Sequence, residues 1–276
     1  MEIKIVEHTD NFIKFVISDV HVSIVNALRR ILLSSVPKMA IEDVEFHLGP
    51  IKDEKGRDYD SVTPLFDEII AHRLGLIPLP TDLKNFNFRS QCTCKGEGCS
   101  SCRIRYSLNK HGPCTVYSGD LQPVDDIKLK VKDELIPIVK LNENQAILIY
   151  AYAELGTAKE HAKWQSCFGV GYKYYPEIEI DQKKCKELDQ TILDQCPPKI
   201  LKKKNGEIVV ENIESCILCG ICERFLPNVG IKVSGNDRKF IMQFETDSSI
   251  TAKEALIYAL NLLIKEFDDL KDGIPS

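Results

Sequence analysis

The sequence has no long hydrophobic run. No apolar stretch approaches the roughly 18 residues that are needed to span a bilayer. The first ten residues, MEIKIVEHTD, carry charges and lack the apolar core of a secretory signal peptide. We therefore expect a cytoplasmic protein with no membrane association.

The chain also has no excess of positive charge. Lysine and arginine total 36 residues against 41 aspartates and glutamates, which gives a net charge of -5 and a pI near 5.8. A protein that binds nucleic acid by itself usually presents a broad basic surface. Little direct contact with nucleic acid is therefore expected.

The motifs of common enzyme classes are missing as well. The sequence contains no phosphate-binding loop (G-x-x-x-x-G-K-S/T), no dinucleotide fingerprint (G-x-G-x-x-G), no H-E-x-x-H and no G-x-S-x-G. The six histidines are scattered, and none is spaced with a carboxylate as a catalytic pair. We expect no catalytic residue in this chain.

The most informative stretch predicts a helix with two apolar sides. With 276 residues, of which 43% are hydrophobic, the chain can form about two domains with a sizeable core. From Val22 to Val36 the apolar side chains cover roughly 240° of a helical wheel, whereas one core needs a stripe only a little over ~100° wide. Pro37 ends the helix. We interpret one face as packing on the core and one on a second polypeptide; the alternative is a fully buried core helix.

A second long helix is predicted near the end of the chain. Thr251 and Glu254 have the spacing of a capping box, and Gly273 follows the last apolar residue as a stop signal. Between them, apolar residues recur in steps of four and three, which is typical of a helix that packs lengthwise on another helix. They are Leu256, Leu260, Leu263, Phe267 and Leu270. We expect both helices to share one domain and one dimerisation surface.

Alternating apolar residues predict strands in much of the remaining chain. Two strands are expected within residues 1–20, and one from Met39 to Phe46 with an irregularity near Asp43. Residues 127–131, 136–141, 146–153 and 230–246 are also expected to be strands, and residues 65–75 a short helix.

Eight of the eleven cysteines fall into two groups with metal-ligand spacing, which in a reducing compartment favours metal binding over disulfides. The first group is Cys92, Cys94, Cys99 and Cys102, with glycines between the two pairs. Two close thiolate pairs can converge tetrahedrally on one Zn²⁺, and four protein ligands make such a site structural. The alternative is a reduced loop without metal.

The second group is Cys216, Cys219 and Cys222, together with the remote Cys196 that precedes a proline. Three cysteines at steps of three and a distant Cys-Pro are the spacing that holds a cubane cluster in bacterial ferredoxins. We predict one 4Fe-4S cluster on these four thiolates. Cys185 as the fourth ligand, a 3Fe-4S cluster, and zinc on the same thiolates remain as alternatives.

These patterns together predict an α+β fold in three parts. Residues 1–48 and 228–276 form a split dimerisation domain of antiparallel strands and two long helices. Residues 49–165 form a mainly β insert domain that carries the four-cysteine loop. Residues 166–227 form a ferredoxin-like iron–sulfur insertion.

Three stretches resemble the assembly subunit of multisubunit RNA polymerases. They are NALRRILLSSVP from Asn26 to Pro37, AHRLGLIPL from Ala71 to Leu79, and ELGTAKEHAKWQ from Glu154 to Gln165. The family comprises the D subunit of archaeal polymerases, the third-largest subunit of eukaryotic polymerase II and the amino-terminal domain of the bacterial alpha subunit. The ferredoxin-like insertion is similar to that of many archaeal members, and the four-cysteine loop is similar to the zinc loop of the eukaryotic relative.

The resemblance implies a non-catalytic subunit of a DNA-directed RNA polymerase, a nucleotidyltransferase. Such a subunit pairs with the small subunit L through its two long helices, and subunits N and P join this pair to form the platform for the two largest subunits. Asn26, Arg29 and Arg30 are then expected at interfaces. The alternative function is a ferredoxin-type electron carrier or an oxidoreductase subunit, which only the cysteine pattern supports.

Overall fold

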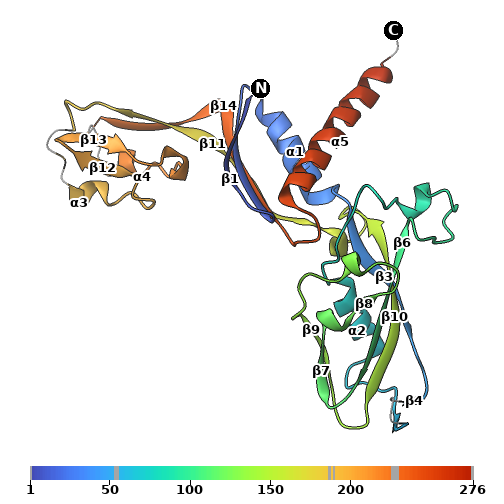
Figure 1. Cartoon of the computed structure of the whole chain (residues 1–276). Coiled ribbons are helices and arrows are strands. Elements are labelled where there is room, and N and C mark those ends of the chain that lie inside the picture. Colours follow the sequence, from blue (N-terminus) through green and yellow to red (C-terminus); the bar gives the residue numbers. More distant parts are fainter. Residues whose placement is uncertain (1, 53–55, 186–187, 189, 225–229, 275–276) are drawn as a thin grey trace. The chain divides into compact units, whose positions relative to one another are not determined.

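A computed structural model describes residues 2–52, 56–185, 188, 190–224 and 230–274 (Figure 1). The chain divides into two units. The first comprises Met1–His8, Ile13–Arg29 and Val170–Phe244, and the second comprises Thr9–Phe12, Arg30–Gly169 and Glu245–Ser276. The domain boundary predicted between residues 227 and 228 lies outside the described residues.

Most of a four-stranded sheet belongs to the first unit. Its order is β1-β2-β14-β11, formed by β1 (Glu2–His8), β2 (Phe12–Ser18), β14 (Ile231–Thr246) and β11 (Cys167–Ile180). β1 and β2 pair antiparallel, which confirms the two strands predicted at the start of the chain. β14 confirms the strand expected over residues 230–246.

The cysteine-rich segment of the first unit has a small core of its own. Its elements are α3 (Gln190–Leu193), the antiparallel pair β12 (Leu201–Lys204) and β13 (Glu207–Val210), and α4 (Ile221–Arg224) (Figure 1). Leu193, Ile200 and Ile208 are buried in this core together with Cys196 and Cys216. The segment therefore packs around its cysteines, but its ferredoxin-like character stays a prediction.

The helix α1 spans Val22–Ser34 and ends before Pro37, as predicted. Val25, Leu28, Ile31 and Leu32 are buried, and flanking apolar residues of the helix are half-buried. The apolar surface of α1 is therefore wide, in agreement with the wheel analysis.

The second unit is organised on the sheet β3-β10-β6-β8, in which each neighbouring pair is antiparallel. The strands are β3 (Lys38–Phe46), β10 (Ala146–Gly156), β6 (Arg103–His111) and β8 (Gln122–Pro123). β3 contains a bulge, because Asp43 lies opposite Tyr152 while Ile41 lies opposite Ala153, leaving Glu42 as the extra residue. The irregularity predicted near Asp43 is confirmed.

One helix and two short strand pairs complete the insert part of this unit. α2 (Asp67–Gly75) buries Ile70 and Leu74 in the core formed with Met39 and Tyr106 of the sheet. The strand pairs are β4 (Ile51–Lys52) with β5 (Asp58–Tyr59), and β7 (Cys114–Tyr117) with β9 (Pro137–Leu141).

The strand expected over residues 127–131 is wrong. Ile127–Leu129 form a single 3₁₀ turn, because the Asp126 carboxylate accepts a hydrogen bond from the backbone amide of Lys128. Ile127 is exposed. The alternation of apolar residues at this point of the sequence therefore does not reflect a strand.

The last helix, α5, spans Ala252–Asp272 and begins with the predicted capping box. Thr251 Oγ1 accepts from the Glu254 amide at 3.2 Å, and the Glu254 carboxylate accepts from the Thr251 amide at 3.3 Å. Gly273 occupies the C-terminal cap. No helix of the described residues has the length and apolar character needed to cross a membrane.

Candidate metal centres and interaction surface

The four-cysteine loop lies between a short 3₁₀ helix (Arg89–Gln91) and the start of β6. Tight turns fold the loop back on itself: the Lys95 amide donates to the Cys92 carbonyl, and the Cys102 amide donates to the Cys99 carbonyl, both at 3.0 Å. Gly96 and Gly98 adopt φ angles of 88° and 92°, which side-chain-bearing residues rarely adopt. The glycines therefore allow the two cysteine pairs to face each other.

The structure brings the four thiols together. The Sγ atoms of Cys92, Cys94, Cys99 and Cys102 all lie within 4.8 Å of one another. The Cys92–Cys99 and Cys94–Cys102 Sγ distances are 3.5 and 3.7 Å, and none of the four forms a disulfide. A tetrahedron with Zn–S bonds of ~2.3 Å has S–S edges of about 3.8 Å. The group can hold one metal ion.

The backbone of the loop favours a thiolate at one position. The amides of Cys99 and Gly98 donate to the Cys94 sulfur and lower the pKa of Cys94 to about 6. Burial raises the pKa of Cys102, whose side chain lies on the inner side of the loop. A cation placed among the thiols would offset that burial penalty, because metal ligation favours deprotonation.

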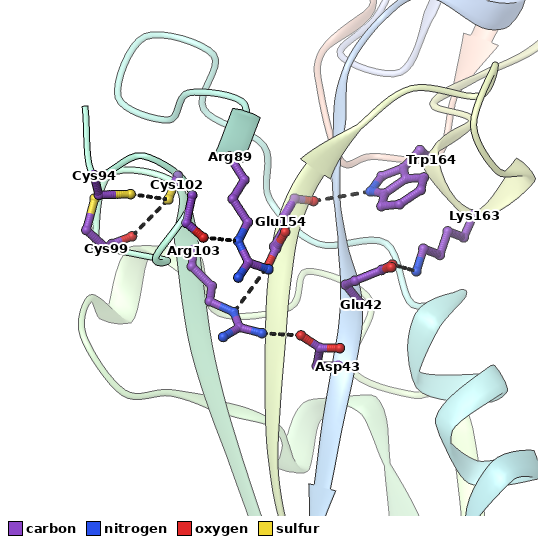
Figure 2. A network of polar contacts seen from close by, with 11 residues as sticks. Glu42, Asp43, Arg89, Cys94, Cys99, Cys102, Arg103, Glu154, Lys163 and Trp164 are labelled. Atoms are coloured by element: carbon purple, nitrogen blue, oxygen red, sulfur yellow. Dashed lines mark hydrogen bonds and ion pairs between the residues drawn. The ribbon is translucent and has the colours of Figure 1, made fainter. Parts of the chain in front are cut away.

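Charged side chains connect this loop to the sheet, as Figure 2 shows. Arg89 and Arg103 flank the loop, and both form ion pairs with Glu154 of β10. Asp43 of β3 pairs with Arg103 from the other side. Sequence reasoning missed this network, although a lone carboxylate at the end of the apolar strand AILIYAYAELG was a signal that it needs a buried partner.

The stretch from Glu154 to Gln165 folds back over the bulge of β3. Lys163 Nζ donates to the Ile41 carbonyl at 3.1 Å and pairs with Glu42 (Figure 2). Trp164 Nε1 donates to the Glu154 carbonyl at 3.2 Å. One of the three stretches that carry the family resemblance thus holds the ends of β3 and β10 together in the sheet of the second unit.

The second cysteine group lines a single small cavity within the first unit. Cys196, Cys216, Cys219 and Cys222 all line it, with apolar walls that include Ile178 and Val233. Burial is the main cause that raises the pKa of Cys222 to about 11, and the nearby Cys196 thiol raises it further. Four thiols around an apolar space are a donor set that suits an iron–sulfur cluster.

Two further residues bear on this cavity. Lys173 Nζ donates to the carbonyls of Glu214 and Cys216 at 2.7 and 2.6 Å, which ties the segment around Cys216 to β11. Cys185 is buried in the same core, but it is not among the described residues that line the cavity.

The structure places the predicted interface residues in three kinds of environment. Leu256 and Leu263 are buried within the chain, Leu260 is half-buried, and Phe267 is exposed. Every residue of α5 from Ile264 to Asp272 is exposed. The apolar side chains of this half of the helix therefore face solvent.

On α1, Asn26 and Arg30 are exposed, whereas Arg29 is half-buried. Arg29 Nε donates to the Val170 carbonyl at 3.2 Å. A half-buried guanidinium needs a polar partner, and the Val170 carbonyl supplies one within the chain.

Comparison with known proteins decides the family. Residues 14–267 match the model of the RNA polymerase Rpb3/Rpb11 dimerisation domain. The chain belongs to this family. Members that it resembles over nearly their whole length include the DNA-directed RNA polymerase subunit Rpo3 of Thermoplasma volcanium, with 47% identity over 274 residues and 99% of both chains covered. The Rpo3 subunit of Picrophilus torridus is 46% identical, with 98% of both chains covered. That of Methanosphaera stadtmanae is 37% identical, covering 98% of this chain and 97% of its own.

Membership of the Rpb3/Rpb11 family confirms the resemblance that the three stretches indicated. The family match includes the cysteine-rich segment, so the alternative of an electron carrier receives no support from it. A dimerisation domain implies pairing with a second, small subunit, in agreement with the exposed Ile264, Phe267 and Leu270 of α5.

Proposed function

We propose that this chain is a non-catalytic assembly subunit of an archaeal-type DNA-directed RNA polymerase. The observation that carries the proposal is the family match over residues 14–267, together with relatives named as subunit Rpo3 at up to 47% identity over nearly the whole chain. The chain forms a heterodimer with small subunit L, subunits N and P join it, and the two largest subunits assemble on this platform and carry the catalysis.

The contact with subunit L uses α1 and α5. Ile257, Ile264, Phe267 and Leu270 of α5 are large apolar residues exposed to solvent. Burying such residues against a partner helix removes apolar surface from water, which is the main driving force of most protein association. Exposed Asn26 and Arg30 of α1 provide polar contacts with the partner subunits, and Arg29 supports α1 from within.

Each cysteine group holds its own cofactor. Cys92, Cys94, Cys99 and Cys102 hold one structural Zn²⁺, which the short distances among their four sulfur atoms support. Cys196, Cys216, Cys219 and Cys222 hold one 4Fe-4S cluster, which their shared cavity supports. Both groups would contribute folding energy by crosslinking their loops.

The experiment that tests the function is purification of the affinity-tagged chain from its own cells under anaerobic conditions. We expect a large assembly that contains the two largest polymerase subunits, L, N and P, and that synthesises RNA on a DNA template. A small, freely soluble protein with redox activity and no partners would contradict the proposal.

The cluster has a separate test. Iron and acid-labile sulfide are measured in the purified chain, and Cys219→Ser is expected to lower both while zinc is retained. Cys114→Ser is the matched control, since this cysteine lies in β7, outside both groups. Loss of the cluster is expected to weaken assembly with the large subunits and to leave pairing with L intact. Undiminished polymerase assembly of the Cys219→Ser protein would overturn the structural role of the cluster.

A further inference from the structure

Two arginines bracket the four-cysteine loop and meet on one carboxylate. Arg89 precedes Cys92 by three positions, and Arg103 directly follows Cys102. Arg89 Nη1 lies 2.8 Å and Arg103 Nε lies 3.1 Å from the same Oε1 atom of Glu154 (Figure 2). The Glu154 side chain is only 10% exposed, so these two ion pairs are screened less than surface pairs.

Each arginine also holds part of the loop itself. Arg89 Nε donates to the Gly96 carbonyl at 2.7 Å, at the turn between the two cysteine pairs. The Arg103 amide donates to the Cys99 carbonyl at 2.9 Å. The Arg103 side chain passes so close to Gly98 that an added Cβ there would lie 3.2 Å from its Cδ. Both halves of the loop are therefore attached to groups that Glu154 holds.

Glu154 is itself held on a rigid element. Its backbone is in the middle strand of β3-β10-β6, where it pairs with Ala40 on one side and Arg103 on the other. Its carbonyl accepts the hydrogen bond from Trp164 Nε1. The Arg103 guanidinium additionally lies over the Tyr152 ring, 4.3 Å from its centroid. The carboxylate is a fixed point with respect to the sheet.

We propose that Glu154 is the positioning residue of the four-cysteine metal centre. By holding Arg89 and Arg103 together, it closes the base of the loop and keeps the four sulfur atoms at ligating distance before an ion arrives. This inference rests on the metal centre proposed above. Closing a flexible loop costs entropy, and a loop that is already closed binds more tightly. Partners outside the ligand shell typically change metal affinity 10- to 100-fold.

The direction in which zinc affinity changes when Glu154 is replaced separates positioning from simple electrostatics. Cysteine thiols release their protons when they bind a divalent ion, so a site of four thiols becomes more negative on binding, and the charge of Glu154 opposes this change at short range. Removing that charge as Glu154→Gln should therefore tighten metal binding if only electrostatics mattered. Positioning predicts the opposite, because the uncharged amide oxygen of glutamine holds two guanidinium groups more weakly than a carboxylate does.

The test is chelator competition for Zn²⁺ on the full-length chain co-purified with its small partner subunit. We expect Glu154→Gln and Arg89→Met each to weaken zinc binding about 10- to 100-fold. The double variant should lose less binding free energy than the sum of the two single variants, because both substitutions break the same contact. Arg89 lies outside the sheet, so Arg89→Met still tests the contact with Glu154 if the Glu154→Gln protein folds poorly. Glu134→Gln is the control, since Glu134 pairs with Lys130 away from the loop. Zinc affinity that is equal or tighter in Glu154→Gln overturns the inference.

A second readout separates this inference from the metal centre itself. Hydrogen exchange of the amides of residues 92–102 is followed in the metal-free wild-type and Glu154→Gln chains. Faster exchange in the variant supports positioning, and equal exchange overturns it. Absence of zinc affinity in the wild-type chain would overturn the proposed metal centre, whereas the exchange result would still decide whether Glu154 holds the loop.

Discussion

Truncating two exposed side chains on α5 should weaken the heterodimer without harming the chain. Ile264 is 60% and Phe267 is 48% exposed, so about half of each side chain is available to a partner. Fully burying such a side chain contributes ~1.5 to 3 kcal/mol. Ile264→Ala with Phe267→Ala should therefore cost about 2 kcal/mol of binding free energy, or roughly a thirtyfold increase in Kd.

The measurement is isothermal titration of the purified chain with its proposed partner, subunit L, at fixed salt. Alanine has a higher helix propensity than isoleucine or phenylalanine, so weaker binding would not reflect a loss of helix. Ile127→Ala with Leu135→Ala is the matched control, because these side chains are 71% and 78% exposed in the same unit but lie outside α5. The urea midpoint of both proteins should stay unchanged. An unaltered Kd, or equal weakening in the control, would refute the assignment of this surface.

Three further predictions concern buried groups. Lys38→Met should lower the free energy of unfolding by about 3 to 5 kcal/mol in urea titrations, since Lys38 Nζ lies 2.5 Å from Asp247 Oδ2 and a buried carboxylate would lose its cation; a loss below about 1 kcal/mol would contradict this. Gly156→Ala should destabilise by about 1 to 3 kcal/mol, because the new Cβ would lie 2.3 Å from the Trp164 ring; an unchanged melting temperature would show that the ring can move aside. Burial raises the pKa of Cys167 from 9.0 to about 12, so its contribution to stability is full below pH 9 and declines as the pH rises toward 12. Iodoacetamide at pH 8 should spare this thiol in the folded chain, and its rapid labelling there would refute the prediction.

Local patterns in the sequence predicted the elements whose causes are local. The capping box at Thr251, the stop at Pro37 and the slip of alternation near Asp43 depend on residues within one or two turns of each other. The convergence of Cys92 to Cys102 also follows from spacing, since the glycines between the pairs permit the necessary turns. These features were visible because each depends on a short stretch of chain.

Long-range contacts were not visible in the same way. Glu154 meets Arg89 across 65 positions and Arg103 across 51, and no periodicity joins such residues. Residues 127–131 were wrongly predicted as a strand, because alternation of apolar residues does not show whether a partner strand exists. Which face of α5 packs inside the chain was equally hidden, since Leu263 is buried and Ile264 exposed although both are large and apolar.

The bulge in β3 has a consequence for how this family can change over time. Before Glu42 the core-facing residues are odd-numbered, Met39 and Ile41, and after it they are even-numbered, Val44 and Phe46. Loss of one residue here would turn the outer half of the strand inside out. A replacement at the exposed position 42 leaves that phase intact. Descendants that change the identity of this residue lose only its ion pair with Lys163, but they inherit its presence as a fixed length of chain.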